Sequence, residues 1–137
     1  MKQTKLLIGI AMALLIGMPA LFAQTINHSV RATVPFQFSV GDKTLEAGQY
    51  LISSTQEKVI TIRNVDNNGF ALALSNAVED FNVVEPKLVF HQYGEKYFLA
   101  QVWLDSGVGR GLAEPSSDKR KLADVYRERD VTVIAAK

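Results

Sequence analysis

The chain has 137 residues, no cysteine, and a formal net charge of +1 from 15 Lys and Arg against 14 Asp and Glu. This length predicts a single folded domain. The lack of cysteine excludes disulfides, thiol nucleophiles and thiolate metal ligands. The near-neutral charge provides no electrostatic reason to bind nucleic acid, so we expect no nucleic-acid partner.

The N-terminal segment, residues 1–23, has the pattern of a secretory signal peptide. Two lysines precede an apolar run from Leu6 to Ile16, and small residues lead to Ala23. A retained membrane anchor is the alternative, but a spanning helix needs about 20 apolar residues. We therefore expect cleavage after Ala23 and export to the periplasm, the cell surface or the medium. The expected mature domain, residues 24–137, does not span the membrane.

Beyond this segment, apolar and polar residues alternate, as is typical of strands that are covered on one face. In the first such run, residues 30–40, Pro35 lacks an N–H and predicts an edge or a corner. Asn-Gly at 68–69 and a turn at Gly94 predict two hairpins. Besides the first run and a strand around Tyr50, we expect strands at residues 59–65, 70–78, 87–93, 97–104 and 131–136.

The segment 116–129 breaks the alternation and predicts a short helix, because Leu122, Val125 and Tyr126 are spaced i, i+3, i+4. The glycine-rich stretch before it, residues 106–115, lacks the spacing of a phosphate-binding loop and is expected to be a flexible loop. Together these patterns predict an all-β, mainly antiparallel fold of about seven or eight strands with one short helix near the C-terminus. A β-sandwich is favoured over a small barrel.

Histidine is the residue type that most often serves in catalysis or metal binding at neutral pH, and the chain has two, His91 and His28. A zinc site needs three or four ligands, usually at short local spacing, and His91 has neither a second histidine nor a cysteine nearby. A Ser–His–Asp site lacks the Gly-x-Ser-x-Gly pattern. We therefore expect no catalytic residue, no metal and no cofactor, and interpret His91 as a strand residue paired with backbone or a carboxylate. A small hydrolase remains a disfavoured alternative.

The strand expected at residues 97–104, YFLAQVWL, is apolar on both faces if it alternates regularly. Its second face, which carries Tyr97, Leu99 and Trp103, is either buried, which is the preferred interpretation, or an exposed patch that contacts a partner. Arg110 in the adjoining loop would then contact an anionic group. The candidate contact residues are Tyr97, Leu99, Trp103, Arg110, His91 and Tyr93.

Two motifs carry a resemblance to a known group of proteins. VPFQFSVGDKTLEAGQYLI starts at Val34, and KLVFHQYGEKYFLAQVW starts at Lys87. Both resemble motifs in a family of small exported bacterial β-rich proteins of unknown function, over most of residues 33–129. The resemblance implies export and a β-rich domain but no catalytic residues. The Leu-x-Ala-Gly-x-Tyr element that ends at Tyr50 also resembles the tyrosine corner of immunoglobulin-like folds.

These observations predict an exported, non-enzymatic envelope protein that serves as a binding or structural module. Its expected partner is an envelope component, either a protein, a glycan or a lipid. The alternative is a small β-barrel that carries an apolar ligand or lipid. That carrier would need a cavity lined by Phe36, Phe38, Phe90 and Phe98.

Overall fold

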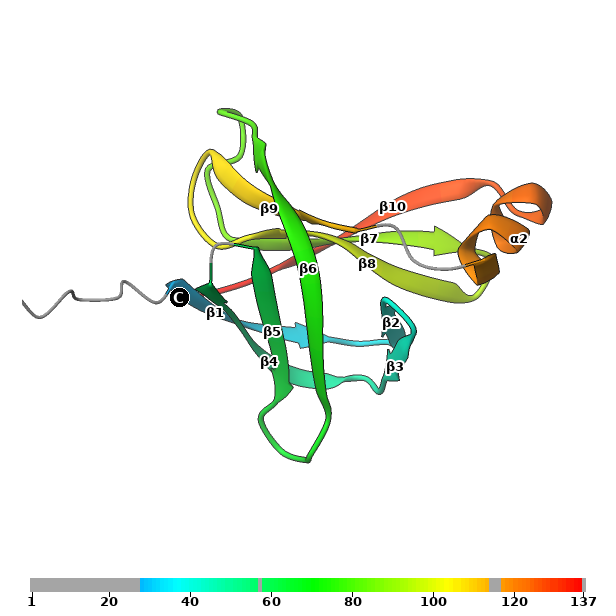
Figure 1. Cartoon of the computed structure of the whole chain (residues 1–137), viewed down its shortest axis with the longest axis horizontal. Coiled ribbons are helices and arrows are strands. Elements are labelled where there is room, and N and C mark those ends of the chain that lie inside the picture. The colour runs from blue at the N-terminus through cyan, green and yellow to red at the C-terminus, as the bar shows by residue number, and fades with distance from the viewer. Residues whose placement is uncertain (1–27, 57, 114–116, 137) are drawn as a thin grey trace, which may run out of the picture.

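The computed structural model describes residues 28–56, 58–113 and 117–136, which form ten strands and one helix (Figure 1). The expected signal segment and its cleavage site lie outside these residues. The elements are β1 (His28–Val34), β2 (Phe38–Val40), β3 (Lys43–Leu45), β4 (Gly48–Gln56), β5 (Val59–Asn64), β6 (Phe70–Glu79), β7 (Lys87–Tyr93), β8 (Lys96–Trp103), β9 (Val108–Leu112), α2 (Ser117–Val125) and β10 (Glu128–Ile134). The prediction of an all-β fold with one short helix near the C-terminus is confirmed. Within the described residues, no helix has the length and hydrophobicity that crossing a membrane requires.

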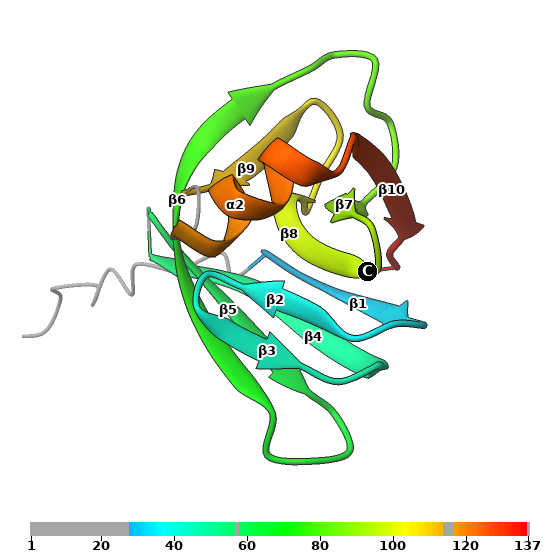
Figure 2. The same cartoon turned by 90° about the vertical axis from the view of Figure 1, so that its right-hand side faces the viewer.

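The strands form two layers that are joined by β6 (Figures 1 and 2). The first layer contains β1, β4, β5 and the first half of β6, and the second contains the rest of β6 with β9, β8, β7 and β10. Residues Phe70–Leu74 of β6 pair with β5, whereas Ser75–Glu79 pair with β9. The sheet is not closed into a barrel. Strand β1 meets the segment after β10 at an isolated bridge, in which the backbones of Arg31 and Ala136 exchange hydrogen bonds of 2.7 and 2.9 Å.

In the first alternating run, residues 30–40, the apolar side chains of β1 form the buried face that the sequence predicts. Val30, Ala32 and Val34 on β1 are buried, and the polar residues between them are exposed. Pro35 ends β1, and after it the chain crosses to the second layer, where β2 pairs in parallel with β8. The corner expected at the proline is therefore present, because its missing N–H ends the pairing with β4.

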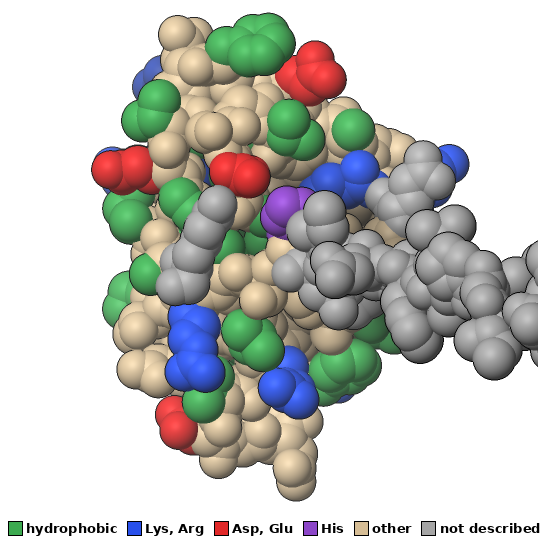
Figure 3. All heavy atoms as spheres, turned by 90° about the vertical axis from the view of Figure 1, so that its left-hand side faces the viewer, with side chains coloured by type: hydrophobic (Ala, Val, Ile, Leu, Met, Phe, Trp, Pro, Cys, Tyr) green, Lys and Arg blue, Asp and Glu red, His purple; other side chains and the backbone are tan. Residues whose placement is uncertain are grey.

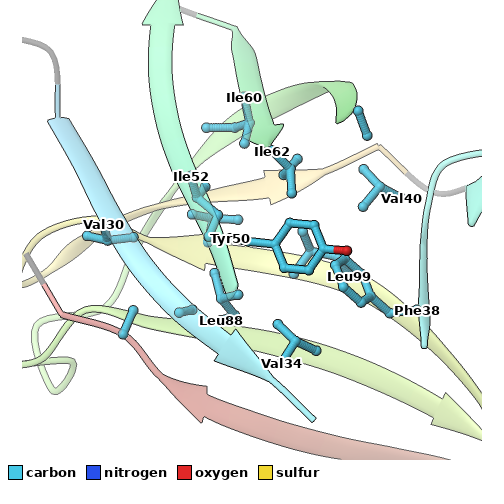
Figure 4. Packing of buried hydrophobic residues seen from close by; sticks show 14 of the residues in the cluster. Val30, Val34, Phe38, Val40, Tyr50, Ile52, Ile60, Ile62, Leu88 and Leu99 are labelled. Carbon is cyan, nitrogen blue, oxygen red and sulfur yellow. The ribbon is translucent and has the colours of Figure 1, made fainter. Parts of the chain in front are cut away.

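Buried hydrophobic side chains fill the space between the layers (Figure 4), and an aromatic cluster lies among them. The ring of Phe38 lies 5.2 Å from that of Tyr50 and 5.3 Å from that of Phe90, measured between centroids, and both contacts are edge-on. The ring of Phe36 lies 4.9 Å from that of Phe90. Phe98 instead contacts Tyr93, away from this cluster. The four phenylalanines that the carrier alternative requires therefore do not line a common cavity.

Tyr50 holds the start of β4 in place, as its motif predicts. Its ring is buried, and its hydroxyl donates a hydrogen bond of 2.5 Å to the carbonyl oxygen of Glu46. Gly48 lies between these two residues, where a Cβ would come within 3.0 Å of the buried side chain of Asn64. The glycine thus permits the close packing that the tyrosine hydrogen bond holds in place.

The expectation of a flexible glycine-rich loop is wrong, because residues 108–112 form β9 between β6 and β8. A contact with Trp103 explains the glycine at position 109 of this strand. A Cβ at this position would lie 2.6 Å from the indole ring of Trp103, so only glycine allows β9 to pass over the tryptophan. The strand count also exceeds seven or eight, since Pro35 divides the first ribbon and the three-residue β3 was not expected.

Gly109→Ala should therefore destabilise the fold by about 1–3 kcal/mol, the usual effect of an inserted methyl group in a packed site. Urea unfolding of the two proteins measures the difference. Gly111→Ala is the matched control, because its Cβ would approach the Val78 side chain at 3.1 Å, a less severe contact than the 2.6 Å to Trp103. Equal losses in both variants would contradict the role assigned to the Trp103 contact.

Candidate functional site

A β-bulge in β8 changes the direction of side chains that regular alternation would place on one face of the strand. The register with β7 shifts so that Val89 pairs with Gln101 but Phe90 pairs with Leu99, which leaves Ala100 as an extra residue. Leu99 consequently points into the main core, whereas Trp103 packs in a second cluster with Val83 and Val89. The expectation that Tyr97, Leu99 and Trp103 share one face is therefore wrong.

The structure also shows how accessible these three residues are. Leu99 and Trp103 are 4% and 2% exposed, in agreement with the preferred interpretation of burial, and neither side chain is available at the surface. The Trp103 indole donates a hydrogen bond of 3.1 Å to the side-chain oxygen of Gln101. Tyr97 is half-buried and stacks on Phe36, with 3.8 Å between ring centroids. These residues serve mainly in packing.

Arg110 lies on β9, which pairs with β8 but not with β7, so it is separated from His91 and Tyr93. Its Nε donates a hydrogen bond of 3.1 Å to Ser75 Oγ. Its Nη2 is buried and has no hydrogen-bond partner among the residues that the structure describes. The side chain borders a pocket of about 300 Å³ together with Leu104 and Asp105.

Two strands and the helix bring together a group of ionisable residues that we call the His91 cluster. Its members are His91 and Tyr93 on β7, Glu128 and Asp130 on β10, and Lys119 on α2. In the antiparallel register, His91 pairs with Asp130 and Tyr93 pairs with Glu128, so that these four side chains share one face of the second layer. Helix α2 lies beside the ends of β7, β8 and β10 (Figures 1 and 2).

Lys119 connects α2 to this cluster. It is only 5% exposed, and its Nζ lies 3.0 Å from His91 Nδ1 and 5.8 Å from the centroid of the Tyr93 ring. A lysine ammonium group has donors but no acceptor, so His91 Nδ1 must accept this hydrogen bond. The proton of the neutral imidazole is then on Nε2.

The Nε2 atom of His91 faces two carboxylates. It lies 3.6 Å from Oε1 of Glu128 and 3.6 Å from Oδ1 of Asp130. The other oxygen of Glu128 accepts a hydrogen bond of 2.5 Å from the Tyr93 hydroxyl. This hydrogen bond lowers the pKa of Glu128 below its ordinary value of 4.5. Partial burial opposes the shift, and electrostatic interactions with His91 and Lys119 contribute to it.

Tyr93→Phe should raise the pKa of Glu128 toward 4.5, because the variant lacks the hydroxyl that stabilises the carboxylate. A folded-state pKa below the unfolded value means that the hydrogen bond stabilises the fold above pH 4.5. This stabilisation is lost as the pH falls through the folded pKa. At neutral pH the variant should lose only about 0.5 kcal/mol, because Glu128 is half exposed.

A carbon-13 NMR titration of the Glu128 carboxyl group measures this shift. Tyr97→Phe is the matched control, since it also removes a phenol hydroxyl but from a ring stacked on Phe36. An unchanged pKa of Glu128 in Tyr93→Phe would show that the hydrogen bond does not govern the titration.

Sequence reasoning placed His91 on a strand, paired with backbone or a carboxylate, but missed Lys119, Glu128 and Asp130 as its neighbours. The charged segment was expected to be helical to residue 129 and the last strand to begin at residue 131. Instead α2 ends at Val125 and β10 begins at Glu128. The alternation of acids in Glu-Arg-Asp-Val-Thr-Val was the available signal, because it places Glu128 and Asp130 on one face of a strand.

Comparisons of the chain with protein-family models, with curated proteins and with solved structures gave no match.

Proposed function

We propose that this chain is an exported, non-enzymatic envelope protein that binds a partner protein through an exposed apolar row on β6. The observation that carries this proposal is the exposure of Phe70, Leu72 and Leu74, which are 39%, 60% and 68% accessible. These side chains are at alternate positions of one strand and all point outward, so they form a row roughly 14 Å long. Contiguous apolar surface of this kind marks interaction sites more often than isolated exposed residues do.

The neighbouring strand adds to this surface, which we call the β6 face. Val59 pairs with Leu74, and Arg63 pairs with Phe70, so the apolar row has an aliphatic neighbour at one end and a basic neighbour at the other. Arg63 and Lys58 are both exposed. These cations favour a partner whose apolar surface is bordered by acidic residues.

The position of the β6 face favours a protein over a lipid bilayer. Residues Phe70–Leu74 pair with β5, and the pairing of β6 with β9 begins only at Ser75, so the row lies on the last strand of the first layer. The exposed face of a sheet can pack against the sheet of another protein, as sheets do in sandwiches. Hydrophobic side chains on another side of the molecule lie in separate spots among charged ones (Figure 3), as is usual for exposed protein surface.

The groups around His91 support a non-enzymatic role. An amine contacts one nitrogen of the imidazole, and carboxylates face the other. A Ser–His–Asp mechanism instead needs a hydroxyl nucleophile on one nitrogen and a carboxylate on the other. The signal-like segment supports export, which places the partner in the cell envelope.

Export predicts a defined N-terminus. The chain isolated from the cells that produce it should begin at Gln24, with the mass of residues 24–137. Intact mass spectrometry and N-terminal sequencing of the envelope and medium fractions would detect this. Recovery of the full-length chain only from the cytoplasm would contradict the export proposal.

Binding through the β6 face predicts a position-specific cross-link. A photoreactive phenylalanine analogue at position 72, incorporated in the producing cells, should yield an adduct with a second protein of different sequence. The same analogue at Val125, which is 75% exposed on α2, is the matched control and should not yield that adduct. Introducing Leu74→Gln beside the probe should weaken the adduct at least several-fold, because it removes apolar contact area.

The other outcomes of this experiment would overturn the proposed partner class. An adduct with a lipid or glycan at position 72 would replace the protein partner with an envelope surface. An adduct of twice the mass of the chain would show self-association. Equal adducts from positions 72 and 125 would show that the β6 face is not a specific contact.

A further inference from the structure

Three metal-ligating atoms converge at the His91 cluster. His91 Nε2, a carboxylate oxygen of Glu128 and a carboxylate oxygen of Asp130 all lie within 4.8 Å of one another. The imidazole nitrogen is 3.6 Å from each of the two oxygens. Ligands bound to a tetrahedral zinc ion at 2.0–2.1 Å are about 3.4 Å apart. The two distances from the imidazole nitrogen are therefore close to the separation that one ion would impose, and the two oxygens lie within 4.8 Å of each other.

The donor set and its exposure also fit a metal ion. Two carboxylates balance the charge of a divalent cation, and an imidazole favours zinc or a similar transition metal over calcium or magnesium. The side chains of Glu128 and Asp130 are 49% and 69% exposed, whereas that of His91 is 20% exposed. An ion could thus enter from solvent, and water would complete its coordination.

We propose that His91, Glu128 and Asp130 form a binding site for a divalent transition-metal ion such as Zn²⁺, and that Lys119 competes with the ion. A metal on Nε2 requires the imidazole proton to move to Nδ1. Nδ1–H would then point at the Lys119 ammonium group, which now donates to that nitrogen at 3.0 Å. Two donors cannot share a hydrogen bond, so Lys119 must withdraw before the ion binds tightly.

Because of this competition, a substitution of Lys119 should strengthen zinc binding, whereas a substitution of any of the three ligands should weaken it. Zinc-bound histidines usually donate their second nitrogen's proton to an acceptor, and such partners change affinity by about 10- to 100-fold. Glutamine at position 119 would replace the ammonium group with a side chain whose oxygen can accept from Nδ1. Lys119→Gln should therefore bind Zn²⁺ about tenfold or more tightly than the unmodified protein. The site lies on the second layer and does not depend on the proposed β6 face.

The test is a titration of Zn²⁺ into the chain as isolated from cells and stripped of metal with a chelator. A competing zinc-sensitive dye would report affinity and stoichiometry. One equivalent should bind, and His91→Gln, Glu128→Gln and Asp130→Asn should each weaken binding by about tenfold or more. His28→Gln is the matched control for histidine content and should leave the affinity unchanged. Nitrogen-15 NMR of the imidazole should show the proton on Nδ1 after Zn²⁺ is added.

Two results would overturn the proposal. Zinc affinity that is the same in Asp130→Asn and in the unmodified protein would place the ion elsewhere. This variant changes a largely exposed side chain, so it keeps the test valid even if circular dichroism shows that His91→Gln does not fold. Affinity that falls or stays constant in Lys119→Gln would refute the competition between Lys119 and the metal.

Discussion

The two-layer structure depends on the change of partner in the middle of β6. The strand leaves β5 after Leu74 and pairs with β9 from Ser75 onward, so a single continuous strand belongs to both layers. Ser75 stabilises this point. It is buried, its backbone N–H and its hydroxyl both donate to the carbonyl of Lys58, and its hydroxyl accepts from Arg110. Without these hydrogen bonds, the polar groups at the crossing would be buried without partners.

This arrangement explains why the two outer faces of the protein differ. The change of layer encloses the aromatic cluster between the sheets, and it leaves the outer side of the first half of β6 uncovered. In the second layer, Lys119 of α2 is buried beside His91 near the ends of the strands, and Val83 in the loop at residues 80–86 packs on Val89 and Trp103. The β6 face and the His91 cluster are therefore separate surfaces with different chemistry, one apolar, the other ionic and partly covered.

Pairing between β7 and β10 gives the His91 cluster its composition. Glu128 and Asp130 follow His91 by more than 35 residues, and only the register of the two strands places their carboxylates beside its imidazole. Lys119 then links this part of the sheet to the helix through a hydrogen bond and a cation–π contact. Because the lysine and the carboxylates have opposite charges, the cluster is stabilised as a unit, and a change at one member alters the environment of the others.

Local patterns in the sequence were sufficient for much of the fold. Alternation from Val30 to Val40 predicted the buried face, Pro35 predicted the corner, and Asn-Gly and Gly94 predicted the hairpins β5–β6 and β7–β8. These features depend on residues that are neighbours along the chain or across a tight turn. Their physical causes, side-chain period, fixed proline φ and glycine freedom, act locally and can be recognised without a structure.

Only the tertiary structure decided the bulge at Ala100, the strand β9 and the neighbours of His91. The bulge changes which face Trp103 occupies, and it arises from the register with β7 rather than from any local pattern. Strand β9 is rich in glycine because Trp103 leaves no space for a Cβ at Gly109, a contact between residues on two paired strands. In the same way, Lys119, Glu128 and Asp130 meet His91 through long-range pairing and packing. The sequence by itself therefore determined the β architecture, while contacts between distant segments determined the candidate site.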